Sequence, residues 1–140
     1  MSKIIDSFSG EYYFLSNFYP WPIHYEGLTY PSVEHAYQAH KSTDVEVHKR
    51  FTDKNMTAAQ AKRLGRELTL TFDWEDRKLP LMEDLLKIKF SGSFMAHTLL
   101  NTKDAELVEG NWWNDTYWGV CKGVGHNHLG RLLMKVRSEL

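Results

Sequence analysis

The residues best suited to chemistry lie in the short segment 30–41. Ser32 is a residue type that often caps the first turn of a helix, so the segment predicts a helix that begins there. Successive helical residues turn by roughly 100°, which brings four polar side chains onto about a third of the circumference: Glu34, Tyr37, Gln38 and Lys41. A carboxylate, a phenol, an amide and an amine on one rigid element could form a catalytic or binding site.

The same spacing also fits a plainer interpretation. A Glu and a Lys seven residues apart usually belong to a solvated helix face. Tyr37 and Gln38 lie between them, however, and this side of the helix has no clear apolar stripe. The opposite side carries small or apolar residues, Val33, Ala36 and Ala39, through which the helix can pack closely against the rest of the protein.

The composition is that of an ordinary folded domain. The chain has 140 residues, 42% hydrophobic and 25% charged, and a formal net charge of −1. This length predicts one domain over residues 1–140, and the charge excludes a molecule-wide field that attracts nucleic acid or membranes. A polyanion would need a local patch, for which Lys62, Arg63 and Arg66 on one predicted helix are candidates.

Cysteine use and hydropathy bear on the compartment. Cys121 is the only cysteine, which excludes an intrachain disulfide and fits a reducing compartment. The chain has no apolar run of 18 residues and no apolar leader at its start. We therefore expect a cytoplasmic protein that makes no membrane contact and has no obligate protein partner.

Turn and capping signals predict a helix-rich α+β fold. Residues 1–30 are rich in aromatic and β-branched types, with a hairpin turn at Glu26–Gly27, so small antiparallel strands are expected near the N-terminus. Trp74 falls in a polar connection, and the stretch 107–119 is strand- or loop-like. Beyond the segment 30–41, helices are expected over 45–51, from a capping box at Thr57 and Gln60 to about Gly65, from Pro80 to about Phe90, over 93–100, and from a cap at Asn127 to the end.

Three other patterns have both a functional and a structural interpretation. The stretch 111–119 holds four aromatic residues and Asp115, and could stack on a heterocycle or simply bury its rings in a turn. Gly119, Gly123 and Gly125 precede the last helix and could hold a phosphate, although the pattern is neither a P-loop nor a Rossmann fingerprint. Residues 14–18 place two small polar side chains between aromatics, which is also typical of core packing.

Metal and serine-hydrolase sites have little support. Cys121, His126 and His128 could supply zinc ligands, but one His-x-His with a lone cysteine is a poor zinc signature. No serine stands in a Gly-x-Ser-x-Gly elbow. We expect no metal and no cofactor.

Taken together, the motifs resemble the NADAR family, also called YbiA-like, of N-glycoside hydrolases. The resemblance extends from Phe14 to Arg137 in five ordered blocks. These blocks are Phe14-Leu15-Ser16-Asn17-Phe18, the segment 30–41, Ala61-Lys62-Arg63-Leu64-Gly65-Arg66, Tyr117-Trp118-Gly119, and Asn127-His128-Leu129-Gly130 with Leu133-Met134 and Arg137.

The resemblance implies a YbiA-like α+β fold and the cleavage of a ribosyl C1–N bond. Members are linked to two substrates: ribosylamine phosphates of early riboflavin synthesis, and guanine in nucleic acid that carries ADP-ribose. The family points to Glu34, Trp74 and Asp115 as functional positions, and Lys41 matches a lysine suspected of catalysis.

Our hypothesis assigns catalysis to Glu34, Lys41 and Asp115, with Lys41 either forming a Schiff base with the sugar or merely binding a phosphate while water attacks directly. The predicted substrate-binding residues are Asn17, Phe18, Tyr37, Trp74, Trp118, Gly119, Gly125 and Asn127. Many relatives carry Gly-Asp-Gly after the tryptophan, whereas Val120 and Cys121 follow Gly119 here, so no role of an acid at that point is carried over.

Two non-enzymatic interpretations remain open. A binding module for ADP-ribose or a nucleotide would need the aromatic residues and the glycine loop, but neither Glu34 nor Lys41. A protein-interaction domain has only the charged helix 45–50 in its favour.

Overall fold

The computed structural model describes residues 3–140, which form two compact units. One unit spans residues 17–89, and the other combines residues up to 16 with residues 90–140. We refer to them as the central unit and the terminal unit. The helices and short strands of the two units confirm the predicted α+β class.

The central unit begins with the predicted hairpin. Strands β2 (Ile23–Tyr25) and β3 (Leu28–Tyr30) pair antiparallel, with Ile23 opposite Tyr30. Glu26 and Gly27 both have positive φ, at 48° and 84°, as a two-residue turn of the primed type requires. The structure therefore confirms the turn read from the sequence.

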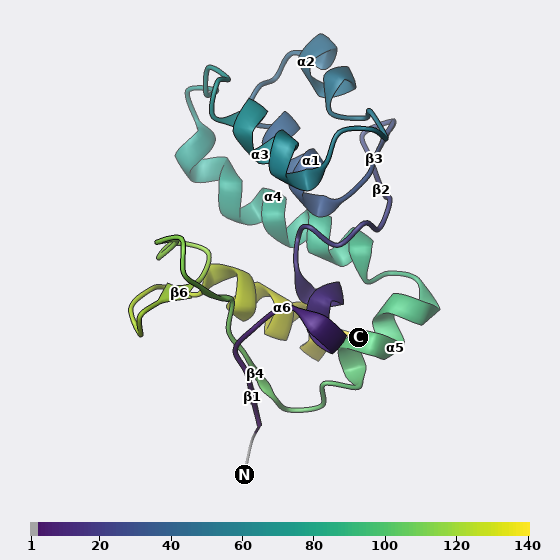
Figure 1. The fold of residues 1–140 in the computed structure, drawn as a ribbon. Coiled ribbons are helices and arrows are strands. Elements are labelled where there is room, and N and C mark those ends of the chain that lie inside the picture. Colours follow the sequence, from purple (N-terminus) through teal and green to yellow (C-terminus); the bar gives the residue numbers. More distant parts are fainter. Residues whose placement is uncertain (1–2) are drawn as a thin grey trace. The chain divides into compact units, whose positions relative to one another are not determined.

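Four helices follow in the central unit: α1 (Val33–Ala39), α2 (Val45–Arg50), α3 (Ala58–Gly65) and α4 (Trp74–Lys89). Figure 1 shows α1 lying between its neighbours, and α1 contacts α2, α3, α4 and both strands of the hairpin. As a result every residue from Val33 to Ala39 is buried. A helix covered on all sides must pair its polar side chains internally.

Capping explains where α1 and α3 begin. Ser32 accepts a hydrogen bond from the His35 amide at 3.2 Å, which confirms it as the cap of α1. Thr57 and Gln60 form the expected capping box, with each side chain accepting from the other's backbone amide. Local hydrogen bonds from these capping residues therefore set the starts of the two helices, as predicted from the sequence.

Helix α4 begins six residues earlier than predicted. Pro80 was expected in its first turn, but the helix starts at Trp74, and Pro80 lies inside it. An interior proline removes one helical hydrogen bond and costs roughly 3 kcal/mol. Burial of the Trp74 side chain and the acidic first turn with Glu75 and Asp76 both favour the additional turns.

The terminal unit is built around α6 (His128–Ser138) and carries two short parallel strand pairs. Helix α5 (Ser93–Leu100) and strand β4 both pack against α6. The pairs are β1 (Ile4–Ile5) with β4 (Glu106–Leu107), and β5 (Gly110–Asn111) with β6 (Val120–Cys121). Residues Gly10–Leu15 form a 3₁₀ helix, η1, for which the sequence had given no specific prediction.

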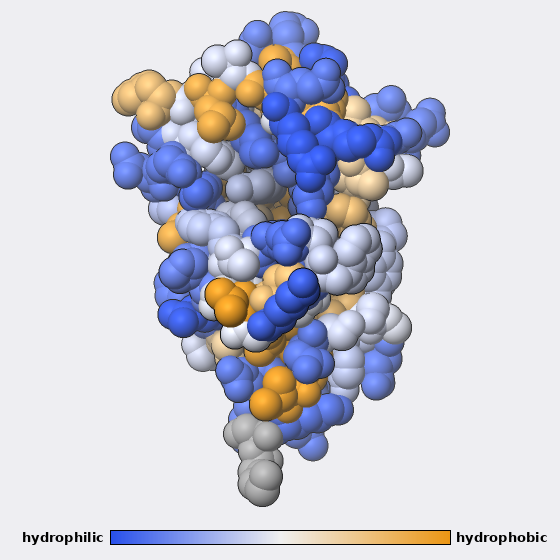
Figure 2. All heavy atoms as spheres, turned by 60° about the vertical axis from the view of Figure 1, so that its left-hand side comes forward, coloured by the Kyte–Doolittle hydropathy of each residue, from blue (hydrophilic) through white to orange (hydrophobic). Residues whose placement is uncertain are grey.

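The surface of the protein is mostly hydrophilic where Figure 2 displays it, with hydrophobic residues in small separate groups. Phe72 and Trp112 are the most exposed of the large hydrophobic side chains among those described. No helix within residues 3–140 is long and apolar enough to cross a membrane.

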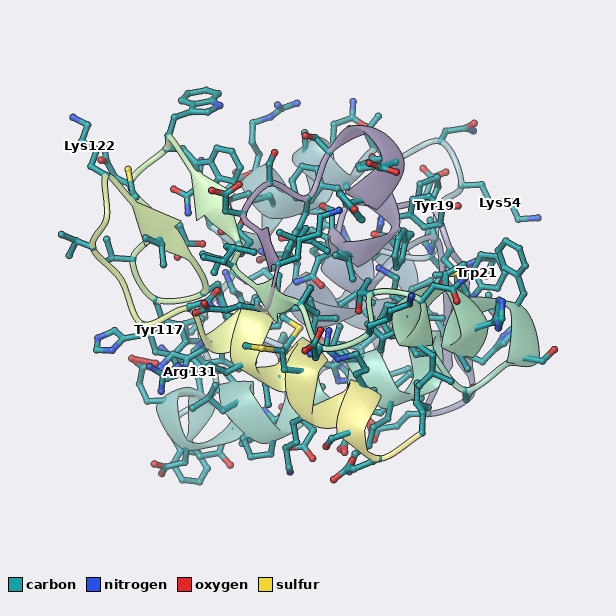
Figure 3. The ribbon with its side chains drawn as sticks, turned by 90° about the horizontal axis from the view of Figure 1, so that it is seen from below. Tyr19, Trp21, Lys54, Tyr117, Lys122 and Arg131 are labelled. Atoms are coloured by element: carbon teal, nitrogen blue, oxygen red, sulfur yellow. The ribbon has the colours of Figure 1, made fainter. Side chains whose placement is uncertain are left out.

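Lys89 is a buried lysine that the sequence did not reveal. It continues the buried stripe of α4 formed by Met82, Leu85 and Leu86, with only 1% of its surface exposed. Its Nζ lies 5.6 Å from the ring centroid of Tyr19, which is labelled in Figure 3. Burial lowers the pKa of Lys89 from 10.5 to about 7, because a charged amine is poorly solvated there.

We predict that Lys89 makes the stability of the fold rise with pH. The folded pKa lies below the unfolded value, so the unfolded chain binds more protons between about pH 7 and 10.5, and the free energy of unfolding increases across that window. Urea unfolding at pH 7 and pH 9 should show this increase, and Lys89→Met should diminish it. Exposed Lys54→Met is the control. If the free energy of unfolding changes equally with pH in all three proteins, the prediction is contradicted.

Candidate active site

Both ends of α1 are fixed by buried histidines. His35 Nε2 lies 2.7 Å from the Met56 carbonyl, so this nitrogen carries the proton, and Nδ1 accepts from the Ser32 hydroxyl at 2.6 Å. Ser32 and His35 are 1% and 2% exposed, so this Ser–His pair has a structural role and is not a nucleophile and base. Its hydrogen bonds join the start of α1 to the loop before α3.

At the other end, His40 anchors the helix against α2 and the hairpin. Its ring lies 4.1 Å from that of His48, and its Nε2 lies 3.3 Å from the hydroxyl of Tyr30. Burial lowers the pKa of His40 to about 4, so the ring is neutral at pH 7. The His40 contacts set the position of the next residue, Lys41.

The polar face predicted for α1 exists, but it is buried and not solvated. Glu34, Tyr37 and Gln38 are between 4% and 7% exposed. Gln38 Nε2 donates to Glu34 Oε2 at 2.6 Å. This arrangement excludes the plain solvated-face interpretation for Glu34.

Lys41 is half-buried in the turn that follows α1. Its carbonyl accepts from the Thr71 amide at 2.9 Å, and its Nζ lies 5.8 Å from the ring centroid of Tyr37. Burial lowers the pKa of Lys41 and the nearby Glu34 carboxylate raises it; Arg66, Lys62 and Lys78 lower it further. The amine therefore loses its proton more easily than an ordinary lysine, which favours a nucleophilic role.

Trp74 and Asn17 extend this cluster within the central unit. The Trp74 ring is 5% exposed and lies 5.3 Å from the ring of Tyr37. The Asn17 carbonyl accepts from the Glu34 amide at 3.1 Å, and half-buried Phe18 follows it. The Asn17 side chain is buried, and its Oδ1 has no hydrogen-bond partner among the described residues. Its contact with a substrate stays a prediction.

The terminal unit holds Asp115 in a structural turn. Asp115 Oδ1 accepts from the amides of Tyr117 and Trp118 at 3.1 and 2.9 Å. The ring of Tyr117, labelled in Figure 3, lies 4.9 Å from the half-buried ring of Trp118. Asp115 thus has a structural reason to be present, and its catalytic role stays a prediction.

Asn127 does not cap α6 with its side chain, contrary to expectation. Its side chain accepts from the Glu109 amide and donates to the Leu107 carbonyl, each at 2.9 Å, while its backbone is left-handed with φ 55°. A Cβ on Gly125, at φ 152°, would lie 2.1 Å from the Gly119 carbonyl oxygen. Both residues therefore shape the loop before α6.

The amides at the start of α6 already have acceptors. Those of Asn127, His128 and Leu129 donate to the carbonyls of residues 119, 117 and 118, at 3.3, 3.2 and 3.0 Å. A phosphate held there would have to displace these bonds. Binding by Gly119, Gly125 and Asn127 through this loop therefore stays a prediction without further support.

The predicted site residues fall into two groups. The central unit brings together six of them, around a single helix: Asn17, Phe18, Glu34, Tyr37, Lys41 and Trp74. The terminal unit carries Asp115, Trp118, Gly119, Gly125 and Asn127. Within residues 3–140 no group of three or more His, Cys, Asp or Glu side chains could hold a metal ion.

Sequence reasoning did not identify Gly65 and Thr71 as supports of the site. A Cβ on Gly65 would lie 1.9 Å from Gln38 Oε1, and the Thr71 amide holds the Lys41 carbonyl. The sequence predicts Gly65 as a helix stop and includes it in the family block 61–66, and neither feature indicates a contact with Gln38. Its φ is not in the positive region, so the contact, and not backbone freedom, requires glycine.

The protein has an α+β fold with buried Glu34 on α1 and half-buried Lys41 in the turn after that helix, and comparison with known proteins identifies the class of protein to which it belongs. The NADAR domain family model matches residues 6–140, and the chain therefore belongs to the NADAR domain family.

The chain is similar to the N-glycosidase YbiA of Escherichia coli, with 38% identity over 96% of this chain and 85% of that protein. The solution structure of E. coli YbiA superimposes with a TM-score of 0.85 and 36% identity, covering 99% of this chain and 86% of that one. The riboflavin biosynthesis protein VVA0006 of Vibrio vulnificus is 43% identical over 91% of this chain, which spans 35% of that protein's length.

We predict opposite effects of two neighbours on the Lys41 amine. Glu34→Gln removes the charge that raises the pKa of Lys41 and should lower it further, whereas Arg66→Gln removes a repulsive charge and should raise it. Competitive labelling with trace acetic anhydride across pH, read by mass spectrometry, gives the pKa of each amine. If the Lys41 amine of the unmodified protein titrates with the ordinary lysine pKa of 10.5, the lowered pKa that we assign to it is contradicted.

Proposed function

We propose that this protein is an N-glycoside hydrolase that cleaves the bond between ribosyl C1 and a nitrogen. The observation that carries the proposal is buried Glu34 on α1 together with half-buried Lys41 just after it, whose pKa is lowered by burial. Relatives named N-glycosidase support the same class of reaction. A module that only bound a nucleotide would not need either ionisable group.

The proposed mechanism begins with ring opening. The C1–O4 bond of the ribosylamine breaks, O4 takes a proton, and C1 becomes an iminium with the base nitrogen. The neutral Lys41 amine adds to C1, and the C1–N bond to the base breaks as that nitrogen takes a proton. Water then adds to the lysine imine, the C1–Nζ bond breaks, and the free sugar leaves. Glu34 carries the protons between these steps.

This route requires a base attached through an exocyclic amine, because only such a nitrogen can form the open-chain iminium. A ribosylamine phosphate of riboflavin synthesis meets the requirement, and relatives named riboflavin biosynthesis proteins favour it. ADP-ribose on the guanine amino group meets it as well. The cationic residues around Lys41, namely Lys62, Arg66 and Lys78, suit the phosphates of either substrate.

We also propose that residues 1–140 act as one NADAR domain, since the family model matches segments of both units. Asp115 is proposed as proton donor to the departing base and Trp118 as a contact for it, on the basis of the family resemblance. Asp115→Asn, which retains the turn-capping oxygen, tests the first role separately from the fold.

We predict that sodium borohydride traps the sugar on Lys41 during turnover, because reduction fixes an imine as a stable amine. Peptide mapping should locate the added mass on Lys41. Lys41→Ala should lose the adduct, and exposed Lys54→Ala should retain it. Continued turnover with no adduct would favour direct attack by water.

We predict that the protein releases ribose phosphate from the riboflavin-pathway ribosylamine, and that Glu34→Gln reduces kcat by about 10²- to 10⁴-fold, as loss of a general acid–base does. Guanine-ADP-ribosylated DNA is assayed in parallel. Release from the DNA alone would make the nucleic acid the substrate, and binding of both without release would support the binding module.

A further inference from the structure

We infer that Gln38 is the positioning residue for the Glu34 carboxylate, and that the absence of a side chain at Gly65 is what allows Gln38 to take this position. The inference rests on the proposed function in one respect, namely that Glu34 moves the protons. It adds a second helix, α3, to the parts that set the chemistry of the site.

The contact between the two side chains is short and shielded from water. Gln38 Nε2 lies 2.6 Å from Glu34 Oε2, and the side chains belong to residues four apart on α1, which places them on the same face. Gln38 and Glu34 are 4% and 7% exposed. With the amide reversed, two oxygens would lie 2.6 Å apart, so an ionised Glu34 requires the N–H group to face it.

The other end of the Gln38 amide is fixed by α3. Its Oε1 is buried, has no hydrogen-bond partner among the described residues, and occupies the space where a Cβ of residue 65 would be. A Cβ there would also come within 2.7 Å of Gln38 Cδ, so any other residue would push the whole amide away. Helices α1 and α3 pack together here.

This contact carries two costs for the fold. Glycine in a helix is less favourable than alanine, and a buried carbonyl without a partner loses its hydration. The glycine and the unpartnered carbonyl both follow from one orientation of the Gln38 amide, in which its N–H group faces Glu34. An apolar residue of similar size, such as methionine, would avoid the second cost.

The chemical consequence lies in the proton affinity of Glu34. A hydrogen bond donated to a carboxylate favours its ionised form, so the Gln38 amide favours the form of Glu34 that can accept a proton. It also occupies Oε2, which orients the carboxylate. The arrangement resembles a general base held by a second residue that never touches the substrate.

The test compares pH profiles of kcat on the ribosylamine phosphate. Gln38→Met keeps the volume and removes the donor, so kcat should fall by about 10- to 100-fold at neutral pH, as expected for a lost hydrogen bond to a charged group. The acid limb of the profile should move to higher pH by about one unit. KM should change little, because the residue acts through Glu34.

Two further variants separate positioning from packing. Gln38→Glu can share one proton with Glu34, so its activity should recover at lower pH, whereas a packing role predicts no such recovery. Gly65→Ala leaves both side chains chemically intact and should shift the profile in the same direction as Gln38→Met. Gly92→Ala is the matched control, because nothing lies within 4 Å of the added methyl group, and it should leave the profile unchanged.

Direct titration of the Glu34 carboxyl by ¹³C NMR keeps this inference distinct from the proposed function. A higher pKa of Glu34 in Gln38→Met, in a protein without turnover, would support the positioning and overturn the activity. Turnover with identical profiles in the unmodified protein, Gln38→Met and Gly65→Ala would overturn the positioning and leave the activity standing. Melting temperatures show which variants are folded.

Discussion

The burial of α1 is the constraint on which the rest of the central unit depends. A helix that is covered on every side cannot leave polar groups to water, so its polar side chains bond inside the protein, with Gln38 Oε1 as an exception among the described residues. His35 is joined to Ser32 and the Met56 carbonyl, Gln38 to Glu34, and His40 to Tyr30 and His48. These contacts leave the helix little freedom to rotate or slide, which is the precondition for a site whose groups must meet a sugar carbon within fractions of an ångström.

The same constraint sets the electrostatics of Lys41. Burial and three neighbouring cations favour the neutral amine, while Glu34 alone among the groups that shift its pKa favours the ammonium. The net effect favours the neutral, nucleophilic form of the amine more than in an ordinary exposed lysine. An exposed lysine would be a poor nucleophile at neutral pH, and a lysine as deeply buried as Lys89 could not reach a ligand.

The terminal unit uses its polar side chains differently, to fix the backbone of a loop. Three side chains of this unit bond backbone groups of residues 109–118 and of strand β4: those of Asn111, Asp115 and Asn127. Gly119 and Gly125 allow backbone segments to approach closely. Its polar residues therefore hold a loop in shape, whereas those of the central unit hold one another. Membership of the NADAR family accounts for both sets of residues being present.

The sequence by itself determined the features that depend on local hydrogen bonds and periodicity: the hairpin turn at Glu26–Gly27, the caps at Ser32 and Thr57, and the polar face of α1. It identified the family through residues that lie in order along the chain. Only the tertiary structure decided that this face is buried, that α4 starts at Trp74 despite Pro80, and that Asn127 bonds a distant strand instead of capping its helix. These outcomes arise from contacts between residues far apart in the chain, as when Gly65 admits the Gln38 amide, and no local pattern encodes such a contact.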